Sequence, residues 1–440
     1  MKTVTTGPAA TRAETTHELP PSVQAALGEL AGAAREGLMA LSVGVGLGVL
    51  HELMEAEVEE VVGPRGRHLP DRRAKRHGHE QTSVTLGARR VAVSRPRVRS
   101  ADDREEVALA TFSHFAARDP LADAVLERML AGVSTRRFER TSEPVGAQVE
   151  RSSRSTSKSA ISREFVARTA ENLAALMTRR LDDVRLACLM LDGIELKGRC
   201  CVVCLGVTTE GEKVPLGLWE GSTENAAVAT ALLSDLVERG LDTAQGVLVV
   251  LDGAKALRKA VRDVLGRSTP VQRCIRHKER NVEDHLPERD RPAVKRRLRA
   301  AWALEDHRRA EEELRRLVAE LERSHPGAAA SLAEGLSETL TITRLGARGA
   351  LKRTLQSTNP CESMIECVRR SSRNVKRWQS GEMCLRWTAA GMLEAERQFG
   401  RIVGYRDLAK LANAIESEVA AAPAVTASPT PAPEVAATPA

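Results

Sequence analysis

The sequence predicts an α/β core that contains a helical insertion and follows a mainly helical region with a small β-hairpin. Unbroken apolar runs, typical of strands covered on both faces, recur between residues 181 and 286. Residues 287–356 are densely charged and keep a helical spacing of leucines. Ahead of the core, apolar and polar residues alternate over residues 82–98. A chain of 440 residues also exceeds what one hydrophobic core usually serves, so we expect two or three folded units.

The N-terminal part is expected to begin with a disordered leader, residues 1–20, which is polar and rich in threonine. It lacks the basic segment and apolar core of a secretory signal. Residues 21–63 have apolar side chains at helical spacing. Within them, Gly44, Gly46 and Gly48 predict a turn between two helices or close packing. The apolar stretch that contains these glycines is too short and too glycine-rich to span a membrane.

Residues 64–105 are expected to form a basic segment that contains the hairpin. Between Pro64 and Arg99 the chain has eleven Lys or Arg residues against two acids. Such a density of cations can neutralise phosphates and release their counterions, although a solvated linker is the alternative. Alternation on both sides of Gly87-Ala88 predicts the two strands. The candidate DNA contacts in this segment are Arg72, Arg73, Lys75 and Arg76.

Residues 106–180 are predicted to be helical and to bind DNA. One helix is expected to begin at Asp119-Pro120 and to end near Leu130, and a second to follow a cap at residues 132–135. A third begins near Ser157. This arrangement is what a helix-turn-helix needs, and it would place Lys158 and Arg163 near base edges. A helical packing module without DNA contacts remains the alternative.

Residues 181–286 are predicted to form the first part of the core. The expected strands are 186–191, 200–207, 214–219, 247–251 and 271–275, with a helix over 225–239 between the third and the fourth. This order of strands and helices is that of the ribonuclease-H-like fold. A right-handed crossover then lays the fourth strand parallel to the first and beside it.

Asp192 and Asp252 each follow an apolar strand in this prediction. Because the two strands are neighbours, both carboxylates are expected at the carboxyl edge of the sheet. Like charges that lie so close repel unless a cation separates them. Mg²⁺ or Mn²⁺ suits such hard oxygen ligands, and a pair of ions can drive an in-line phosphoryl displacement. The alternative for either residue alone is a turn aspartate at a strand end.

Glu362 is the candidate third acid. It lies on a helix expected to begin at Asn359-Pro360, within residues 357–416, which would complete the core after the insertion at residues 287–356. Spacing alone leaves a second role open, because Asn359 as N-cap and Glu362 at the third helical position make a capping box. Residues 417–440 are rich in Ala and Pro and are expected to be a disordered tail.

Short blocks of sequence carry a further signal. In the core they are Leu191-Asp192-Gly193-Ile194, Asp252-Gly253-Ala254-Lys255, Gln272 to His277 with Arg280-Asn281, and Ser357-Thr358-Asn359 with Glu362. Outside it they are Arg76-His77-Gly78, Pro96 to Arg99, Gly132 to Arg136, Ser157-Lys158-Ser159, and Arg386-Trp387 with Gly391 to Glu396. Together, in this order, they resemble the mutator-type bacterial insertion-sequence transposases, from about Val23 to Ile415.

The resemblance implies a catalytic and metal-binding triad of Asp192, Asp252 and Glu362, with the helical insertion ahead of the glutamate. It favours catalysis over capping for Glu362. The chain departs from the family pattern at Lys255, where many relatives have a histidine, and at Pro360-Cys361 before the glutamate. Neither departure removes a carboxylate.

The pair Cys274 and His277 matches a Cys/His motif of the same family. As zinc ligands the two would need partners, for which Cys201 and Cys204 are the candidates, but residues three apart on a strand face opposite sides. We therefore expect Cys274 to be buried in the fifth strand, and His277, Lys278 and Arg280 to face DNA. Trp302 is expected in the core of the insertion, with stacking on an unpaired base as the alternative.

The remaining candidate DNA contacts lie after Glu362 and Glu366, and no acid falls between them. They are Arg369, Arg370, Arg373 and Lys376. With a net charge of +7, they favour a polyanionic partner such as double-stranded DNA. The resemblance implies that this DNA comprises the inverted repeats and a target. Joining two ends implies a homodimer or a higher oligomer. Eight cysteines without a secretory signal predict reduced thiols and a cytoplasmic, nucleoid-associated protein.

Three functions fit the sequence. The first is a transposase that cleaves DNA and transfers the strand; the second is a nuclease of the same fold that cuts without joining. The third is an inactive or domesticated transposase that only binds DNA. The long basic N-terminal half favours the first over the second, because a transposase must recognise its own ends.

Overall fold

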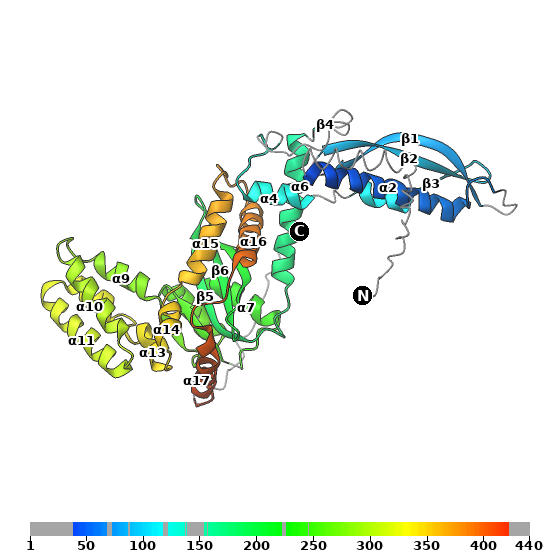
Figure 1. Ribbon diagram of the computed structural model, residues 1–440. Helices are drawn as coiled ribbons and strands as arrows, with labels where there is room; N and C mark the ends of the chain where they lie inside the picture. The colour runs from blue at the N-terminus through cyan, green and yellow to red at the C-terminus, as the bar shows by residue number, and fades with distance from the viewer. Residues whose placement is uncertain are drawn as a thin grey trace, which may run out of the picture. The chain divides into compact units, whose positions relative to one another are not determined.

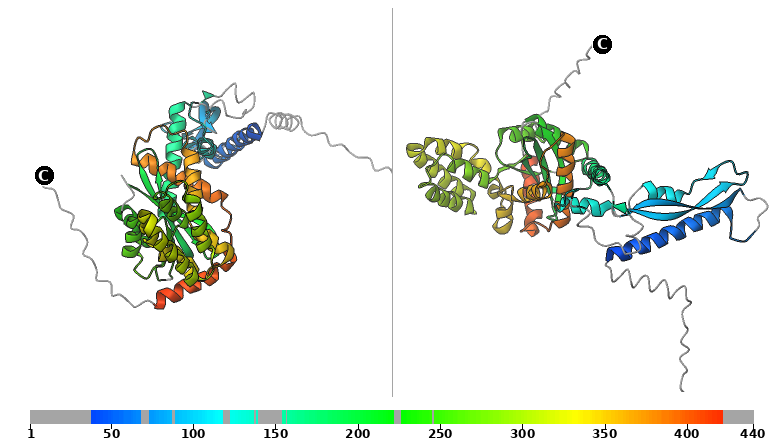
Figure 2. Two further views of the ribbon diagram at one scale, coloured as in Figure 1. Left: turned by 90° about the vertical axis from the view of Figure 1, so that its left-hand side faces the viewer. Right: turned by 90° about the horizontal axis from the view of Figure 1, so that it is seen from above.

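A computed structural model shows a mixed α/β protein that is mostly helical (Figure 1). It describes residues 38–67, 73–86, 89–117, 122–136, 138, 154–155, 157–221, 226–244 and 246–421. The chain divides into two compact units, drawn from further directions in Figure 2. Unit 1 comprises residues 1–128 and 133–164, and unit 2 comprises residues 129–132 and 165–440. Among the described residues, no helix is long and apolar enough to cross a membrane.

Unit 1 is built on a long hairpin packed against one helix. Strands β1 (Ala74–Leu86) and β2 (Arg89–Ser100) pair antiparallel, and β3 (Glu106–Val107) and β4 (Arg154–Ser155) add to β2. Helix α2 (Leu38–Val62) supplies the other side of the core. The core side chains include Leu50, Met54, Val58, Val84, Val91 and Val98, all at most 2% exposed. Alternation on the strands and helical spacing on α2 place these residues on facing surfaces.

The hairpin and α2 differ in two ways from the prediction. The strands extend well beyond residues 82–98, because pairing reaches back to Ala74; the predicted Gly87-Ala88 turn lies outside the described residues. The expected turn at Gly44, Gly46 and Gly48 is wrong, since α2 runs through all three as one helix. Close packing is not found there either, because an added Cβ at any of these glycines would meet no atom of the described residues within 4 Å.

Among the described residues between the hairpin and the sheet of unit 2 are the helices α3 (Ala110–Ala117), α4 (Ala122–Leu130) and α6 (Lys158–Thr178). Glu57 of α2 accepts hydrogen bonds from the amides of Ala110 and Thr111, at 2.6 and 2.9 Å, and so satisfies two free N–H groups of α3. Helix α6 begins where predicted, and Ser157 Oγ accepts from the amide of Ala160. The predicted middle helix of the helix-turn-helix lies outside the described residues.

The centre of unit 2 is a five-stranded sheet in the order β7-β6-β5-β8-β9. The strands are β5 (Leu186–Glu195), β6 (Cys200–Thr208), β7 (Lys213–Gly221), β8 (Leu248–Leu251) and β9 (Val271–Arg273). Strand β6 pairs antiparallel with β5 and β7, whereas β8 pairs parallel with β5 and β9. All five predicted strands are present.

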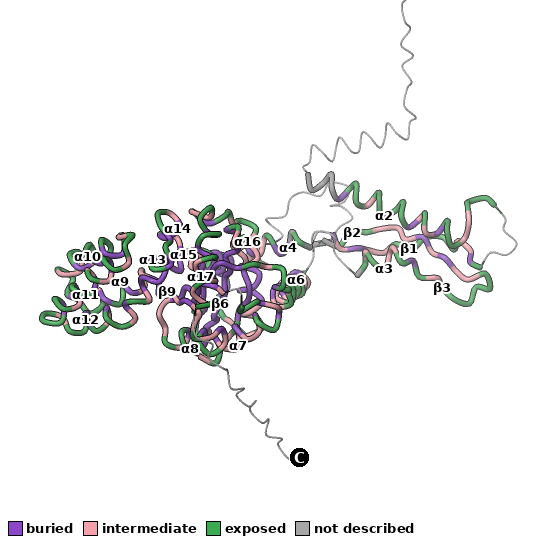
Figure 3. Tube along the Cα trace, turned by 90° about the horizontal axis from the view of Figure 1, so that it is seen from below, coloured by how far each residue is buried: buried purple, intermediate pink, exposed green. Residues whose placement is uncertain are grey.

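Helices cover both faces of this sheet, which explains why its central strands β5, β6 and β8 are largely apolar (Figure 3). One face packs against α15 (Asn359–Ser372), α16 (Gly381–Gln398) and α17 (Leu408–Ala421). The other packs against α7 (Ala226–Glu238) and α8 (Lys255–Val264). The sheet is thus the middle layer of three.

The predicted helical insertion lies between β9 and α15 and has its own core, visible beside the sheet in Figure 1. Its helices are α9 (Ile275–Glu283), α10 (Arg291–Ala303), α11 (His307–Ser324) and α12 (Pro326–Ala333). The short elements η2 (Ser337–Leu340), α13 (Thr341–Arg344) and α14 (Gly349–Leu355) lead back to the sheet. Trp302 is 1% exposed in this core, and its indole N–H donates to Thr339 Oγ1 at 3.1 Å. Its expected packing role is therefore confirmed.

Four predicted boundaries are wrong. Strand β5 continues through Glu195, so Asp192 lies inside the strand. Strand β9 ends at Arg273 and α9 begins at Ile275, which makes Cys274 the residue before a helix and not part of the strand. The insertion begins with α9, ahead of residue 287. Helix α17 reaches Ala421, so the first residues of the predicted disordered tail are helical.

Candidate active site

The register of the sheet places the two aspartates beside each other. Leu191 pairs with Leu251 across the parallel strands β5 and β8, and Asp192 and Asp252 are the next residues on each. Asp192 is only 8% exposed. Its Oδ1 accepts from the amide of Gly193 at 2.9 Å, and Oδ1 of Asp252 accepts from the amide of Ala254 at 2.8 Å. Backbone groups thus fix both carboxylates at the carboxyl edge of the sheet.

Glu362 lies in the first turn of α15, which packs against β5 and β6. The hydroxyl of Thr358 donates to Glu362 Oε1 at 3.1 Å, and the backbone amide of Glu362 donates to Thr358 O at 2.8 Å. The N-cap is Thr358, and it makes no side-chain cap hydrogen bond. The capping box that the spacing left open for Asn359 is therefore not formed, and Glu362 accepts from the hydroxyl of the N-cap residue instead.

Asp192 and Glu362 line one cleft of about 490 Å³. Its other charged or titratable lining residues are His277, Arg280, Glu366 and Arg369. Asp252 is not among the described residues that line this cleft, although it is close enough to raise the pKa of Asp192 by its charge. The cleft therefore joins residues from β5, α9 and α15 that are up to 177 positions apart in the chain.

The pKa of Asp192 reflects its burial and the charged groups around it. Burial raises its pKa to about 6, and the negative charges of Asp252 and Glu362 act in the same direction. The positive charge of His277 and the hydrogen bond from Gly193 oppose the shift. At neutral pH the cleft holds acids whose mutual repulsion a cation would relieve.

His277 projects from α9 toward these acids. Hydrogen bonding to Cys274 raises its pKa to about 9 against the effect of burial, with support from the charges of Asp192 and Asp252. His277 is half-buried, which fits its predicted position at the site. Cys274 is fully buried, as expected, and its sulfur lies 3.5 Å from both the amide and the hydroxyl of Thr358. Thr358 therefore touches both the Cys/His motif and Glu362.

Cys274, His277 and Glu362 also place one ligand atom each within 4.8 Å of one another. The alternative zinc site required Cys201 and Cys204 as further ligands. These two residues lie in the cores on opposite faces of the sheet, so the expectation that they cannot converge is confirmed. All eight cysteines are buried free thiols.

The donor set of the aspartates and Glu362 suits a hard divalent cation. Three carboxylates offer the oxygen ligands that Mg²⁺ and Mn²⁺ prefer. Burial, and to a smaller extent the charges of Asp252 and Glu362, raise the pKa of Asp192, and a bound cation would favour its ionised form. The residue types of the predicted triad therefore suit these metal ions, although the three carboxylates are not among the described groups that bring one ligand atom each within 4.8 Å of one another.

Some of the predicted DNA contacts of unit 2 line the cleft or are exposed, whereas others bond to groups of the protein itself. Arg280 and Arg369 line the cleft beside Glu362, and Lys376 is exposed. Arg370 donates to Gln398 Oε1 at 3.5 Å, and Arg373 donates to Ala131 O at 3.3 Å. Lys278 does not face DNA as predicted, because it is 2% exposed and its ammonium group donates to the carbonyls of Ser331 and Glu334.

Some of the predicted DNA contacts of unit 1 are exposed, and others form ion pairs within the unit. Arg73, Lys158 and Arg163 are exposed, and Arg72 lies outside the described residues. Lys75 pairs with Asp103, and Arg76 pairs with Glu55 at 2.8 Å. These two cations are therefore partly neutralised within the unit, which their position in a basic run could not reveal.

Sequence reasoning gave Thr358 no role of its own, and it overlooked Ser363 as part of the cleft. The position of Ser363 one residue after Glu362, on the same helical turn, is the signal that could have found it. For Thr358 no local signal existed, because its contact with Cys274 joins residues 84 positions apart.

Comparison with known proteins agrees with this picture. The family model for Mutator-family transposases matches residues 33–401. The transposase of insertion sequence element IS6120 from Mycolicibacterium smegmatis is 33% identical over 187 residues, covering 41% of this chain and 56% of that protein. The transposase of ISRM5 from Rhizobium meliloti is 27% identical over 80% of this chain and 86% of its own length. The transposase of IS256 in transposon Tn4001 from Staphylococcus aureus is 25% identical over 74% and 83%, respectively. The chain belongs to the Mutator family of transposases.

Proposed function

We propose that this transposase binds the terminal inverted repeats of an insertion sequence and catalyses metal-dependent cleavage of DNA followed by strand transfer into a target. The observation that carries the proposal is the arrangement of three acids from distant parts of the chain. Asp192 and Glu362 face one cleft, and Asp252 neighbours Asp192 across paired strands. The names of the three relatives, all transposases of insertion sequences, support the same activity.

The strand order supports a ribonuclease-H-like core. The central strand β5 is flanked by the antiparallel pair β6 and β7 on one side and by the parallel strands β8 and β9 on the other. This matches the order expected from the sequence, with the helical elements between β9 and α15 as the insertion.

In the proposed mechanism, Asp192, Asp252 and Glu362 would hold a pair of Mg²⁺ or Mn²⁺ ions. When bound, such ions would supply the activation of a water or a 3′-hydroxyl and the stabilisation of the leaving oxygen in an in-line displacement. Arg280 and Arg369 at the cleft orient the scissile phosphate. His277, positively charged at neutral pH because its pKa is about 9, offers an N–H donor to the same phosphate. Holding two transposon ends together requires a homodimer or a higher oligomer.

Labelled inverted-repeat DNA incubated with Mg²⁺ tests the proposal. Asp192→Asn and Glu362→Gln should each lower cleavage by more than about 100-fold, beyond the 10- to 100-fold loss typical of residues that only support a metal ligand. Glu366→Gln is the matched control, because Glu366 is exposed in the same cleft one helical turn away. It should retain most of the activity.

The products separate the three candidate functions. Cleavage with joining supports the transposase, and cleavage alone indicates a nuclease. Binding without Mg²⁺-dependent cleavage by the wild type indicates a protein that only binds DNA, and it would overturn the proposal.

A further inference from the structure

The outer face of α8 carries a row of cations that the proposed mechanism does not use. Lys255, Arg258, Lys259 and Arg262 are all exposed, and their spacing of three and four residues places them on one side of the helix. Arg267, exposed just beyond the helix, extends the row. The opposite side of α8 is buried against the sheet through Leu257, Ala260 and Val261. Burial of these apolar side chains fixes the orientation of the cationic face.

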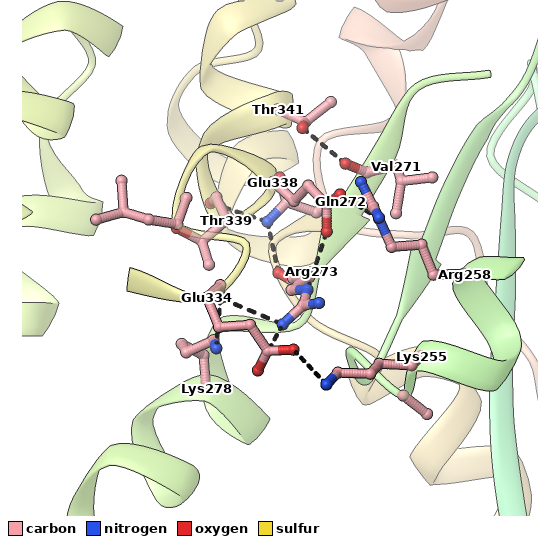
Figure 4. Close-up of polar contacts among 12 residues, drawn as sticks. Lys255, Arg258, Val271, Gln272, Arg273, Lys278, Glu334, Glu338, Thr339 and Thr341 are labelled. Atoms are coloured by element: carbon pink, nitrogen blue, oxygen red, sulfur yellow. Dashed lines mark hydrogen bonds and ion pairs between the residues drawn. The ribbon is translucent and has the colours of Figure 1, made fainter. Parts of the chain in front are cut away.

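Acids around this face neutralise only part of its charge. Glu334 lies 3.9 Å from Lys255, and Glu338 pairs with Arg258, as Figure 4 shows. Glu338 is also shared with the buried Arg273, at 2.9 Å. Asp263 pairs with Lys259.

Two cations of the row form no direct pair. The side chains of Arg262 and Arg267 have no ion pair or hydrogen bond with any residue that the structure describes, although Asp263 is near enough for their charges to lower its pKa. Nearby, Arg344 is occupied by Glu418. The row therefore presents an excess of positive charge, greatest toward its C-terminal end.

The surface along this row is also concave. The cations that line a hollow of about 410 Å³ are Lys255, Arg258, Lys259, Arg262 and Arg273, beside Glu334 and Glu338. Those that line an adjoining hollow of about 370 Å³ are Arg258, Arg262, Arg267 and Arg344, beside Glu338 and Glu418. The two hollows share Arg258 and Arg262. Guanidinium groups at the rim of a polar hollow are suited to phosphate oxygens, which they can bind through two parallel hydrogen bonds.

The row begins three residues after Asp252, at the edge of the sheet that holds the acids. Ten helical residues extend about 15 Å, which is the distance over which one DNA strand presents four or five phosphates. A duplex whose scissile phosphate lies at the acids could therefore continue along this face.

We propose that the exposed face of α8, with Arg267, binds the phosphate backbone of duplex DNA without reading its sequence. The inference rests on the proposed function, since it names the surface that holds DNA next to the same acids. Because this face binds phosphates only, it would serve flanking and target DNA as well as transposon ends.

The salt dependence of DNA binding tests this surface. The double variant Arg262→Ala/Arg267→Ala and the wild type are compared on a duplex of arbitrary sequence in EDTA, so that no cleavage occurs. Removing one cation that neutralises a phosphate reduces the slope of log K against log salt by about 0.9, so the slope should fall by about 1.8. A duplex carrying the inverted repeats should show the same reduction.

The control is Arg308→Ala/Arg309→Ala, which removes two exposed arginines of α11 that lack side-chain partners among the described residues. It should leave the slope unchanged, and equal thermal unfolding of all three proteins excludes a folding defect. An unchanged slope in the α8 variant, or an equal reduction in the control, would overturn the inference. The outcome is independent of catalysis: a reduced slope together with a wild type that never cleaves overturns only the proposed function.

Discussion

Asp192 is a buried carboxylate close to two other acids, and this has a cost for folding. Its pKa rises to about 6 from the usual 3.8, because burial and the charges of Asp252 and Glu362 disfavour the ionised form. The folded state therefore holds a proton that the unfolded state has released between these two pH values. Stability consequently falls as the pH rises from about 4 to above 6, and stays lower at neutral pH.

Asp192→Asn should therefore stabilise the protein at pH 7.5 in EDTA, by at most about 3 kcal/mol for a shift of this size. The gain should shrink as the pH approaches 4, where Asp192 is protonated in the folded state. Unfolding by urea at several pH values measures the difference. Asp263→Asn is the control, since Asp263 is exposed on α8 and its ion pair with Lys259 lowers its pKa. Equal stability of wild type and Asp192→Asn at pH 7.5 would show that Asp192 carries no such cost.

At the scale of elements, the attachment of the helical insertion to the sheet depends on β9. Gln272 is fully buried there: its amide nitrogen donates to Thr339 O at 2.9 Å, and its Oε1 accepts from the amide of Ile342 at 2.9 Å. The neighbouring Arg273 is held by Glu338, and Thr341 Oγ1 donates to Val271 O (Figure 4). These bonds tie η2 and α13 to the edge of the sheet.

Gln272→Leu should lower the free energy of unfolding because it leaves a buried N–H and a buried carbonyl without partners. Each unsatisfied group costs about 1–3 kcal/mol, so the expected loss is about 2–6 kcal/mol. Denaturant unfolding measures it. Gln398→Leu makes the same chemical change at an exposed position of α16 and should cost less than about 0.5 kcal/mol. A loss no larger than that of the control would contradict this account of the junction.

The same elements show what the sequence can and cannot predict. The central strands of unit 2 were predictable because both faces of the sheet are covered, so β5, β6 and β8 each contain a long apolar run. The end of β5 was not, since backbone pairing with β6 continues through Glu195 beyond the polar Asp192. The N-cap of α15 was misplaced by one residue because Thr358, Asn359 and Pro360 all favour a helix start.

The candidate site shows a similar division. The strand order was enough to predict that Asp192 and Asp252 are neighbours, and the resemblance to a family singled out Glu362. The approach of Cys274 to Thr358 and the internal ion pairs of Lys75 and Arg76 depend on long-range packing. The cations of α8 are different. Their helical spacing is visible in the sequence, but only the structure shows that they share one exposed face.

At the scale of the whole molecule, each unit has a hydrophobic core of its own. The core of unit 1 lies between α2 and the hairpin, whereas unit 2 is centred on the two cores that cover its sheet. Units with separate cores can unfold as separate cooperative transitions. We therefore predict two transitions in scanning calorimetry, each responding to substitutions in one core only.

Met54→Ala and Leu233→Ala test this prediction. Both side chains are at most 1% exposed, and truncation of a buried Leu or Met costs about 2–5 kcal/mol. Met54→Ala should lower the transition of unit 1 and leave the other in place, while Leu233→Ala should do the reverse. Exposed Val403→Ala, in unit 2, is the control and should move neither. If each buried variant instead lowers one common transition, the two cores unfold together, and the division into units has no thermodynamic counterpart.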